Sequence, residues 1–165
     1  MVLGINVAVS PFSICILTED NKEFIVQETG TREFTETLID KISSLCEKAG
    51  GTLADLKAVG VVHGPGAYTG LRIGVVTAKS LGQSYGIPIY SISTLEAIAL
   101  SHLKTPGTYF SIIPAVGTEV NTAMFSINNG EINRITDDFS ITQEVLENKL
   151  KQFNEAIYCV GIIPE

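Results

Sequence analysis

The sequence contains little of what catalytic or metal sites are usually built from. Its 165 residues include two histidines, three cysteines and no tryptophan. Cys15, Cys46 and Cys159 are far apart and form no CxxC pair, so we expect reduced thiols rather than a disulfide framework. His63 and His102 have no metal-ligand spacing, and the chain has neither a Walker A loop nor a GxSxG element. We therefore expect no metal, no cofactor and no catalytic residue.

Positive charge and long apolar runs are scarce as well. The chain carries 11 lysines and arginines against 18 aspartates and glutamates, for a formal net charge of −7. Because phosphate backbones repel such a chain and no basic cluster offsets the charge, we expect no direct nucleic-acid binding. No apolar run approaches the roughly 20 residues of a membrane span, and no basic segment precedes the first apolar one. We expect a cytoplasmic protein without membrane contact.

Apolar residues, in contrast, are plentiful and recur with the periods of strands and helices. They make up 45% of the chain, against 18% charged residues, which is enough for one domain or two small lobes. The first part predicts strands at 2–9, 12–17, 23–28, 58–62 and 89–92, and helices at 33–49, 68–85 and 94–103. The second part predicts strands at 109–115, 120–127, 131–135 and 155–160, and a helix at 142–153.

The same order of elements thus begins twice, as three strands, a helix and a strand. A β-β-β-α-β-α unit that occurs twice is the plan of the actin-like ATPase (ASKHA, ribonuclease H-like) fold, an α/β fold with helices packed on mixed sheets. Thr105-Pro106-Gly107 is the best boundary. We therefore predict a first actin-like subdomain at 1–104 and a second, shortened one at 105–165, which stops where its next helix should begin.

The predicted helix 68–85 has small residues at every fourth position. Three of these four residues, Gly70, Gly74, Ala78 and Gly82, are glycines. A glycine inside a helix costs about 1 kcal/mol relative to alanine, so three of them need a structural reason. Residues four apart share one face of a helix, and a face without bulk lets another backbone come close. Packing on the chain's own sheet and contact with a partner both fit this spacing.

A second apolar face on the same helix favours a partner. Ile73 and Val76 lie among serine and threonine residues, on a side that a monomeric protein usually makes charged. We take this helix as the candidate interface. The predicted partner-binding residues are Ile73, Gly74, Val76, Ala78 and Ser80.

The first strand and the glycine-rich turn offer the best places to look for a nucleotide site. In actin-like ATPases an aspartate at the end of the first strand positions the metal-bound phosphates, and this chain has Asn6 there, an uncharged and poorer ligand for Mg²⁺. The turn Gly64-Pro65-Gly66 precedes a helix and could hold a phosphate on backbone N–H groups. That signal is weak, because Pro65 has no N–H to donate.

The stretch 63–82, HGPGAYTGLRIGVVTAKSLG, resembles the GPGSFTGLRIG-type signature of the TsaB (YeaZ) family, a glycoprotease-like (M22-like) family. The segments VLGINVAVSPFSICIL, REFTETLIDKI and STLEAIA extend the resemblance over residues 1–104. The resemblance implies an actin-like fold and a non-catalytic partner subunit in the biosynthesis of the tRNA modification threonylcarbamoyladenosine. It also implies that helices 33–49 and 68–85 bind the catalytic subunit TsaD or a second copy, and that an ATPase, TsaE, joins the complex.

The chain departs from the family pattern at several positions. Asn6 replaces an aspartate, Phe34 replaces a histidine at the helix entry, and PAVGTEVN at 114–121, with Val116, replaces a DARxGEVY-type motif. Two other functions therefore stay open beside the partner subunit. One is a stand-alone dimeric module without a role in the pathway. The other is an ATP-dependent enzyme or M22-like peptidase, which the missing carboxylate and the missing metal cluster argue against.

The missing carboxylate gives a first prediction. We expect the chain neither to hydrolyse ATP nor to bind Mg²⁺-nucleotide tightly, because Asn6 lacks the charge that positions the metal and the second half stops before the part that closes over a nucleotide. Isothermal titration calorimetry with ATP and Mg²⁺ should show no low-micromolar binding. A low-micromolar Kd that Asn6→Ala abolishes would contradict this expectation.

Overall fold

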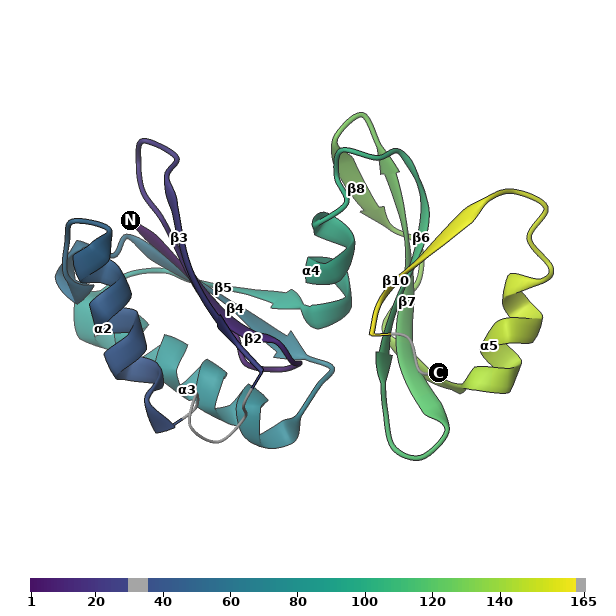
Figure 1. Ribbon diagram of the computed structural model, residues 1–165, viewed down its shortest axis with the longest axis horizontal. Helices are drawn as coiled ribbons and strands as arrows, with labels where there is room; N and C mark the ends of the chain where they lie inside the picture. Colours follow the sequence, from purple (N-terminus) through teal and green to yellow (C-terminus); the bar gives the residue numbers. More distant parts are fainter. Residues whose placement is uncertain (30–35, 163–165) are drawn as a thin grey trace. The chain divides into compact units, whose positions relative to one another are not determined.

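The computed structural model describes residues 1–29 and 36–162 and divides the chain into two compact units (Figure 1). Unit 1 comprises Met1–Ile92 and unit 2 comprises Ser93–Glu165. Phe34 and the predicted start of the helix at residue 33 lie outside the described residues.

Unit 1 is a five-stranded sheet in the order β3-β2-β1-β4-β5. Its strands are β1 (Val2–Asn6), β2 (Phe12–Leu17), β3 (Glu23–Glu28), β4 (Ala58–Gly64) and β5 (Ile89–Ser93). Strand β1 pairs antiparallel with β2 and parallel with β4. Its helices are α2 (Leu38–Lys48) and α3 (Tyr68–Tyr85), with a short 3₁₀ turn, η1 (Leu53–Asp55), between them.

Helices α2 and α3 cover one face of this sheet. Side chains alternate between the two faces of a strand, so Leu3 and Ile5 in β1 point to the same side. They join one buried cluster with Leu38 and Ile42 of α2 and with Leu81 of α3. These side chains of the two helices and the sheet together form the core of unit 1. Neither α3, with 18 residues, nor any other helix among the described residues is long and apolar enough to cross a membrane.

Unit 2 repeats this topology. Its strands are β6 (Gly107–Pro114), β7 (Glu119–Asn128), β8 (Glu131–Arg134), β9 (Phe139–Thr142) and β10 (Ile157–Gly161). The order is β10-β6-β7-β8, and β9 also pairs with β7. As in unit 1, the first strand lies antiparallel to the second and parallel to the strand that follows the helix, here α5 (Gln143–Leu150). The repeat that the sequence predicted is confirmed.

The third strand of unit 2 differs from the prediction, because it is broken into β8 and β9. Arg134 pairs with Phe125 and Phe139 pairs with Thr122, so residues 135–138 stand opposite only two residues of β7. The sequence predicted a single strand at 131–135 and missed β9. The polar residues 136–138 interrupt the apolar alternation that a strand prediction depends on.

Helix α4 (Thr94–Leu100) lies in unit 2, although the sequence boundary at residues 104/105 groups it with the first subdomain. It lies against β6, β7, β8 and β10 and buries Leu95 and Ala99 completely. Helix α5 lies on the other face of the sheet, where Leu146 joins Phe110 and Ile112 in a second cluster. Ser93, the N-cap, defines where the helix starts, but a cap carries no information about which sheet the helix covers.

Two glycines of α3, and Gly66 just before the helix, lie against the residues that follow β1. A Cβ atom on Gly70 would lie 1.8 Å from the carbonyl oxygen of Val7, and one on Gly66 would lie 2.5 Å from that of Ala8. A Cβ atom on Gly74 would lie 2.7 Å from Cγ2 of Val7. The start of the helix therefore runs against the backbone that follows β1, at a distance that only glycine permits.

This close approach predicts the effect of a single methyl group. Gly70→Ala should lower the free energy of unfolding by about 2–3 kcal/mol or more, because the backbone oxygen of Val7 cannot move aside cheaply. Chemical denaturation followed by circular dichroism measures the effect. The control is Thr69→Ala at the neighbouring exposed position, which should stay within about 0.5 kcal/mol of wild type. Equal stabilities for the two variants would show that the helix can retreat from β1.

Candidate partner-binding surface

Two of the five predicted interface residues are used inside the chain. Ala78 is completely buried, and Gly74 is buried against Val7. The small-residue face of α3 thus turns toward the chain's own sheet. This corrects the assignment of Gly74 and Ala78 to a partner surface, because a spacing of four defines a close contact without saying which backbone makes it.

The opposite face of α3 is open to solvent. Val76 has 61% of its surface exposed at the middle of the helix, and Tyr68 has 72% exposed at its start. The guanidinium carbon of Arg72 lies 5.4 Å from the centroid of the Tyr68 ring, one turn away. Ser80 is exposed beside Val76, whereas Ile73 is half-buried and packs on the edge of the core. Val76, Ser80 and the outer part of Ile73 remain available to a partner.

Helix α2 adds an apolar side chain that the sequence prediction did not include. Nζ of Lys41 lies 2.5 Å from Oε1 of Glu28, which fixes that flank of α2 toward the edge strand β3. Ile39 and Ser43 are each two residues from Lys41, about half a turn around the helix, so they lie on the opposite flank of α2. This flank faces the middle of the sheet, which α3 covers. Ile39 is 46% exposed. The only sequence signal for it is its place at the rim of the apolar arc of α2.

The rotation of α3 is fixed by its contacts with β4 and β5. Leu71 lies near Gly64 at the end of β4, and Gly82 lies against Ile89 at the start of β5. Ile73 is about half a turn around the helix from Leu71 and from Gly82. It therefore faces away from β4 and β5, toward the strands that α2 covers. The apolar residues of the two helices therefore point toward a common strip between them.

Charges of opposite sign border this strip. Asp40 and Glu47 are exposed on α2, and Arg72 and Lys79 are exposed on α3. No acidic residue occurs anywhere in α3. We call this the α2–α3 surface. It consists of the central residues Ile39, Ser43, Ile73, Val76 and Ser80, the acidic ridge Asp40 and Glu47, and the basic ridge Arg72 and Lys79.

The place where an actin-like ATPase would hold phosphate is occupied by contacts within the chain. The side-chain oxygen of Asn6 accepts a hydrogen bond from the backbone N–H of Ala8 at 3.2 Å. The N–H of Ala67, at the start of α3, donates to the carbonyl oxygen of Ala8 at 2.7 Å. With Pro65 lacking an N–H, the turn has few donors left for an anion. The same contacts that hold α3 against β1 therefore use the groups that phosphate binding needs.

The chemically reactive side chains are spread through the structure. Burial raises the pKa of the thiols of Cys15, Cys46 and Cys159, which keeps them protonated and weakly nucleophilic. The ring of His102 stacks on Tyr109, with centroids 5.5 Å apart, and His63 is exposed near the end of β4. Among residues 1–29 and 36–162, no three His, Cys, Asp or Glu side chains are grouped so that they could hold a metal ion.

A shallow pocket of about 390 Å³ lies elsewhere in unit 1, beside the turn between β2 and β3. Its charged residues pair with one another, since Lys57 forms an ion pair with Glu19 and Nζ of Lys22 lies 2.7 Å from Asp20. These groups are well exposed to solvent, where ion pairs contribute little. Asp55, which also lines the pocket, accepts hydrogen bonds from the N–H and the hydroxyl of Thr52. Because these polar groups are engaged with one another, the α2–α3 surface is the stronger candidate.

Comparison with known proteins identifies the relatives of this chain. The family model "TsaD: tRNA N6-adenosine threonylcarbamoyltransferase" matches residues 18–156. The tRNA threonylcarbamoyladenosine biosynthesis protein TsaB of Bacillus subtilis is 28% identical over 97% of this chain and 70% of its own length. A tRNA N6-adenosine threonylcarbamoyltransferase of Agrobacterium fabrum is 31% identical over 111 residues, which cover 67% of this chain but only 30% of the transferase.

A solved structure agrees with these relatives. YeaZ from Pseudomonas aeruginosa superimposes with a TM-score of 0.78 at 22% identity, covering 86% of this chain and 67% of the YeaZ chain. This likeness confirms the predicted actin-like (ASKHA) fold, in which the repeated strand order of units 1 and 2 is the defining feature. From the family match and the TsaB likeness along nearly its whole length, the chain belongs to the TsaD family and is a TsaB (YeaZ)-type member of it.

Proposed function

We propose that this chain is a non-catalytic partner subunit of a TsaD-type protein in the cytoplasmic biosynthesis of tRNA N6-threonylcarbamoyladenosine. The observation that carries the proposal is the α2–α3 surface, where Val76 and Ile39 are exposed on the outer side of two helices that cover the sheet. An exposed apolar centre bordered by charge is typical of a protein interface. The names of the relatives support a role in threonylcarbamoyladenosine biosynthesis, and the α2–α3 surface supports a role in binding another protein.

The chemistry of the chain supports a role in binding rather than in catalysis. Asn6 is engaged with Ala8, and the three thiols have raised pKa values. A nucleophile needs a lowered pKa or an adjacent base. In the complex we propose, a TsaD-type subunit supplies the catalytic groups and a TsaE-type ATPase supplies nucleotide hydrolysis.

The likeness between this chain and the transferases suggests how the two proteins would pair. The Agrobacterium transferase resembles this chain over 111 residues, so a TsaD-type partner would offer helices of the same kind. Two related surfaces, each with an acidic and a basic ridge, are complementary when one is turned by half a rotation relative to the other. In this arrangement the acidic ridge, Asp40 and Glu47, requires basic residues on the facing helix of the partner, and the basic ridge requires acidic ones.

The same argument applies to two copies of this chain. A two-fold axis that runs along the strip between α2 and α3 places the acidic ridge of one copy opposite the basic ridge of the other. A stable interface buries about 800 Å² on each partner, which is compatible with the outer sides of two helices. We therefore expect the homodimer and the complex with the TsaD-type protein to exclude each other.

A charge in the middle of the α2–α3 surface should prevent partner binding. Val76→Asp removes an apolar side chain whose burial contributes about 1.5–3 kcal/mol and puts an unpaired carboxylate in its place, so we expect Kd to rise by about 100-fold or more. Calorimetry with the TsaD-type protein of the same genome measures Kd, and a reconstituted tRNA modification assay with a TsaE-type ATPase measures function. The matched control is Val116→Asp, at a valine that is 88% exposed in unit 2, which should bind as wild type.

Circular dichroism should show that both variants are folded, because both valines are exposed. Equal Kd values for wild type and Val76→Asp would move the interface away from α3. A folded wild-type chain that neither binds the TsaD-type protein nor supports modification would contradict the proposed function itself and leave the stand-alone dimeric module.

The two-ridge pairing can be tested by mixing two charge variants. One carries Arg72→Glu and Lys79→Glu, so that both ridges are acidic, and the other carries Asp40→Lys and Glu47→Lys, so that both are basic. Each should be a monomer alone in sedimentation velocity, because like ridges meet in its homodimer. An equimolar mixture should restore the dimer. Dimers that persist in both variants alone, or a mixture that stays monomeric, would rule out this pairing.

A further inference from the structure

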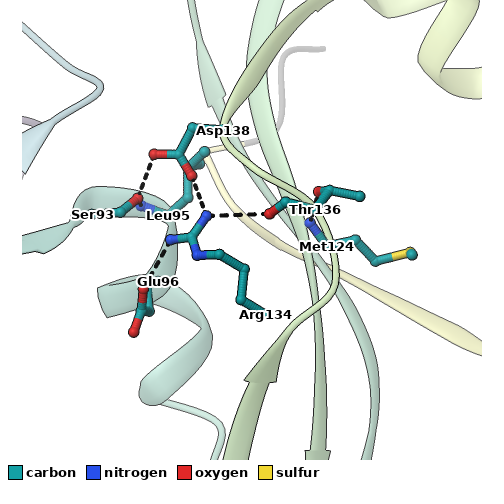
Figure 2. A network of polar contacts seen from close by, with 7 residues as sticks. All are labelled: Ser93, Leu95, Glu96, Met124, Arg134, Thr136 and Asp138. Carbon is teal, nitrogen blue, oxygen red and sulfur yellow. Dashed lines mark hydrogen bonds and ion pairs between the residues drawn. The ribbon is translucent and has the colours of Figure 1, made fainter.

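A network of polar contacts lies within unit 2 (Figure 2). Nη1 of Arg134 donates to Oδ1 of Asp138 at 2.6 Å, and Nη2 donates to Oε2 of Glu96 at 2.8 Å. The hydroxyl of Ser93 donates to Oδ2 of Asp138 at 2.7 Å and accepts from the backbone N–H of Leu95 at 3.2 Å. We call Ser93, Glu96, Arg134 and Asp138 the Arg134 clamp. It ties the first turn of α4 to the end of β8.

Ser93 has an unusual position in the chain. It is the last residue of β5, the N-cap of α4 and the first residue of unit 2. Since the units are Met1–Ile92 and Ser93–Glu165, the chain passes between them only once, at this residue. Strand β5 of unit 1 therefore continues into a helix of unit 2 without any linker. Hinges between domains commonly lie at such terminal residues of elements, which absorb the change in backbone angles.

The break between β8 and β9 brings Asp138 to this point. Residues 135–138 stand opposite two residues of β7, which makes a bulge with two extra residues. The bulge is held at Met124, whose N–H donates to Oγ1 of Thr136 at 2.9 Å and whose carbonyl oxygen accepts from the N–H of Ile135 at 2.8 Å. Bulges bend a strand and redirect a side chain. Here the redirected side chain is Asp138, which is hydrogen-bonded to Ser93.

The surroundings of Arg134 make the clamp stronger than an ordinary surface ion pair. Its guanidinium carbon lies 4.8 Å from the centroid of the Phe125 ring, and Nη1 also donates to the carbonyl oxygen of Thr136 at 3.3 Å. The side chains of Arg134, Glu96 and Asp138 are each about 30% exposed. An arginine that divides its planar group between two carboxylates is held in one geometry, which a lysine cannot reproduce.

We propose that the Arg134 clamp restrains the hinge between the two units. By binding Ser93 through Asp138 and the first turn of α4 through Glu96, Arg134 holds the unit 2 side of the only connection. Without the clamp, the angles at Ser93 are free to change while each unit keeps its own core. The clamp therefore limits the range of orientations that unit 1 takes relative to unit 2.

The test measures distances between the units in the full-length chain. An amino acid with a ketone side chain replaces Lys48 in unit 1 and Glu131 in unit 2, which are both exposed. A nitroxide label is attached to each ketone, so the three native cysteines are not modified. Double electron–electron resonance then gives the distribution of distances, with an excess of unlabelled chain to suppress signals between copies. We expect Arg134→Gln to broaden this distribution, and hydrogen-exchange protection of the Leu95 amide to fall about tenfold.

Matched variants separate a restrained hinge from a simple loss of stability. Lys41→Gln removes a cation from the ion pair with Glu28 in unit 1 and should leave the distribution unchanged. Ser93→Ala removes the contact with Asp138 but keeps Arg134, so it should broaden the distribution as well, and it takes the place of Arg134→Gln if that variant does not fold. Lost protection at Leu95 together with an unchanged distribution would overturn the proposal and leave the clamp as a staple within unit 2.

Discussion

The contact between the start of α3 and the backbone that follows β1 is the constraint on which unit 1 depends. The space between Gly70 and the carbonyl oxygen of Val7 admits no side chain, and the N–H of Ala67 donates to Ala8 at the same place. This contact fixes which side of α3 faces the sheet. The opposite side, with Val76, is turned to solvent as a consequence. The interface that we propose is therefore determined by a backbone contact on the other side of the same helix.

The same constraint bears on catalysis. An actin-like ATPase needs free donors and a carboxylate where β1 meets the glycine-rich turn. In this chain Asn6 binds Ala8, and Ala8 in turn accepts from Ala67, so these groups hold two backbone segments together. These hydrogen bonds engage polar groups that a phosphate would need, which agrees with the expectation that the chain binds nucleotide weakly. In this chain the corner holds in place the helix that carries the proposed partner-binding surface.

The sequence predicted the elements and their repeat, because the apolar periods of two and 3.6 residues depend only on local burial. It did not predict contacts that depend on elements far apart in the chain. The spacing of Gly74 and Ala78 required a close backbone, and only the fold shows that this backbone belongs to the same chain. Ile39 was missed because its exposure depends on the rotation of α2, which the ion pair of Lys41 with Glu28 defines.

Unit 2 shows how a local signal can be correct and still incomplete. Ser93 caps α4 as its sequence indicates, by accepting from the N–H of Leu95. A capping box would turn the carboxylate of Glu96 back to the helix start, yet Glu96 binds Arg134, 38 residues away. The cap is completed by Asp138, which the bulge after β8 brings to it. Unit 1 thus depends on a close backbone contact, whereas the start of unit 2 depends on the ion pairs of one arginine, Arg134.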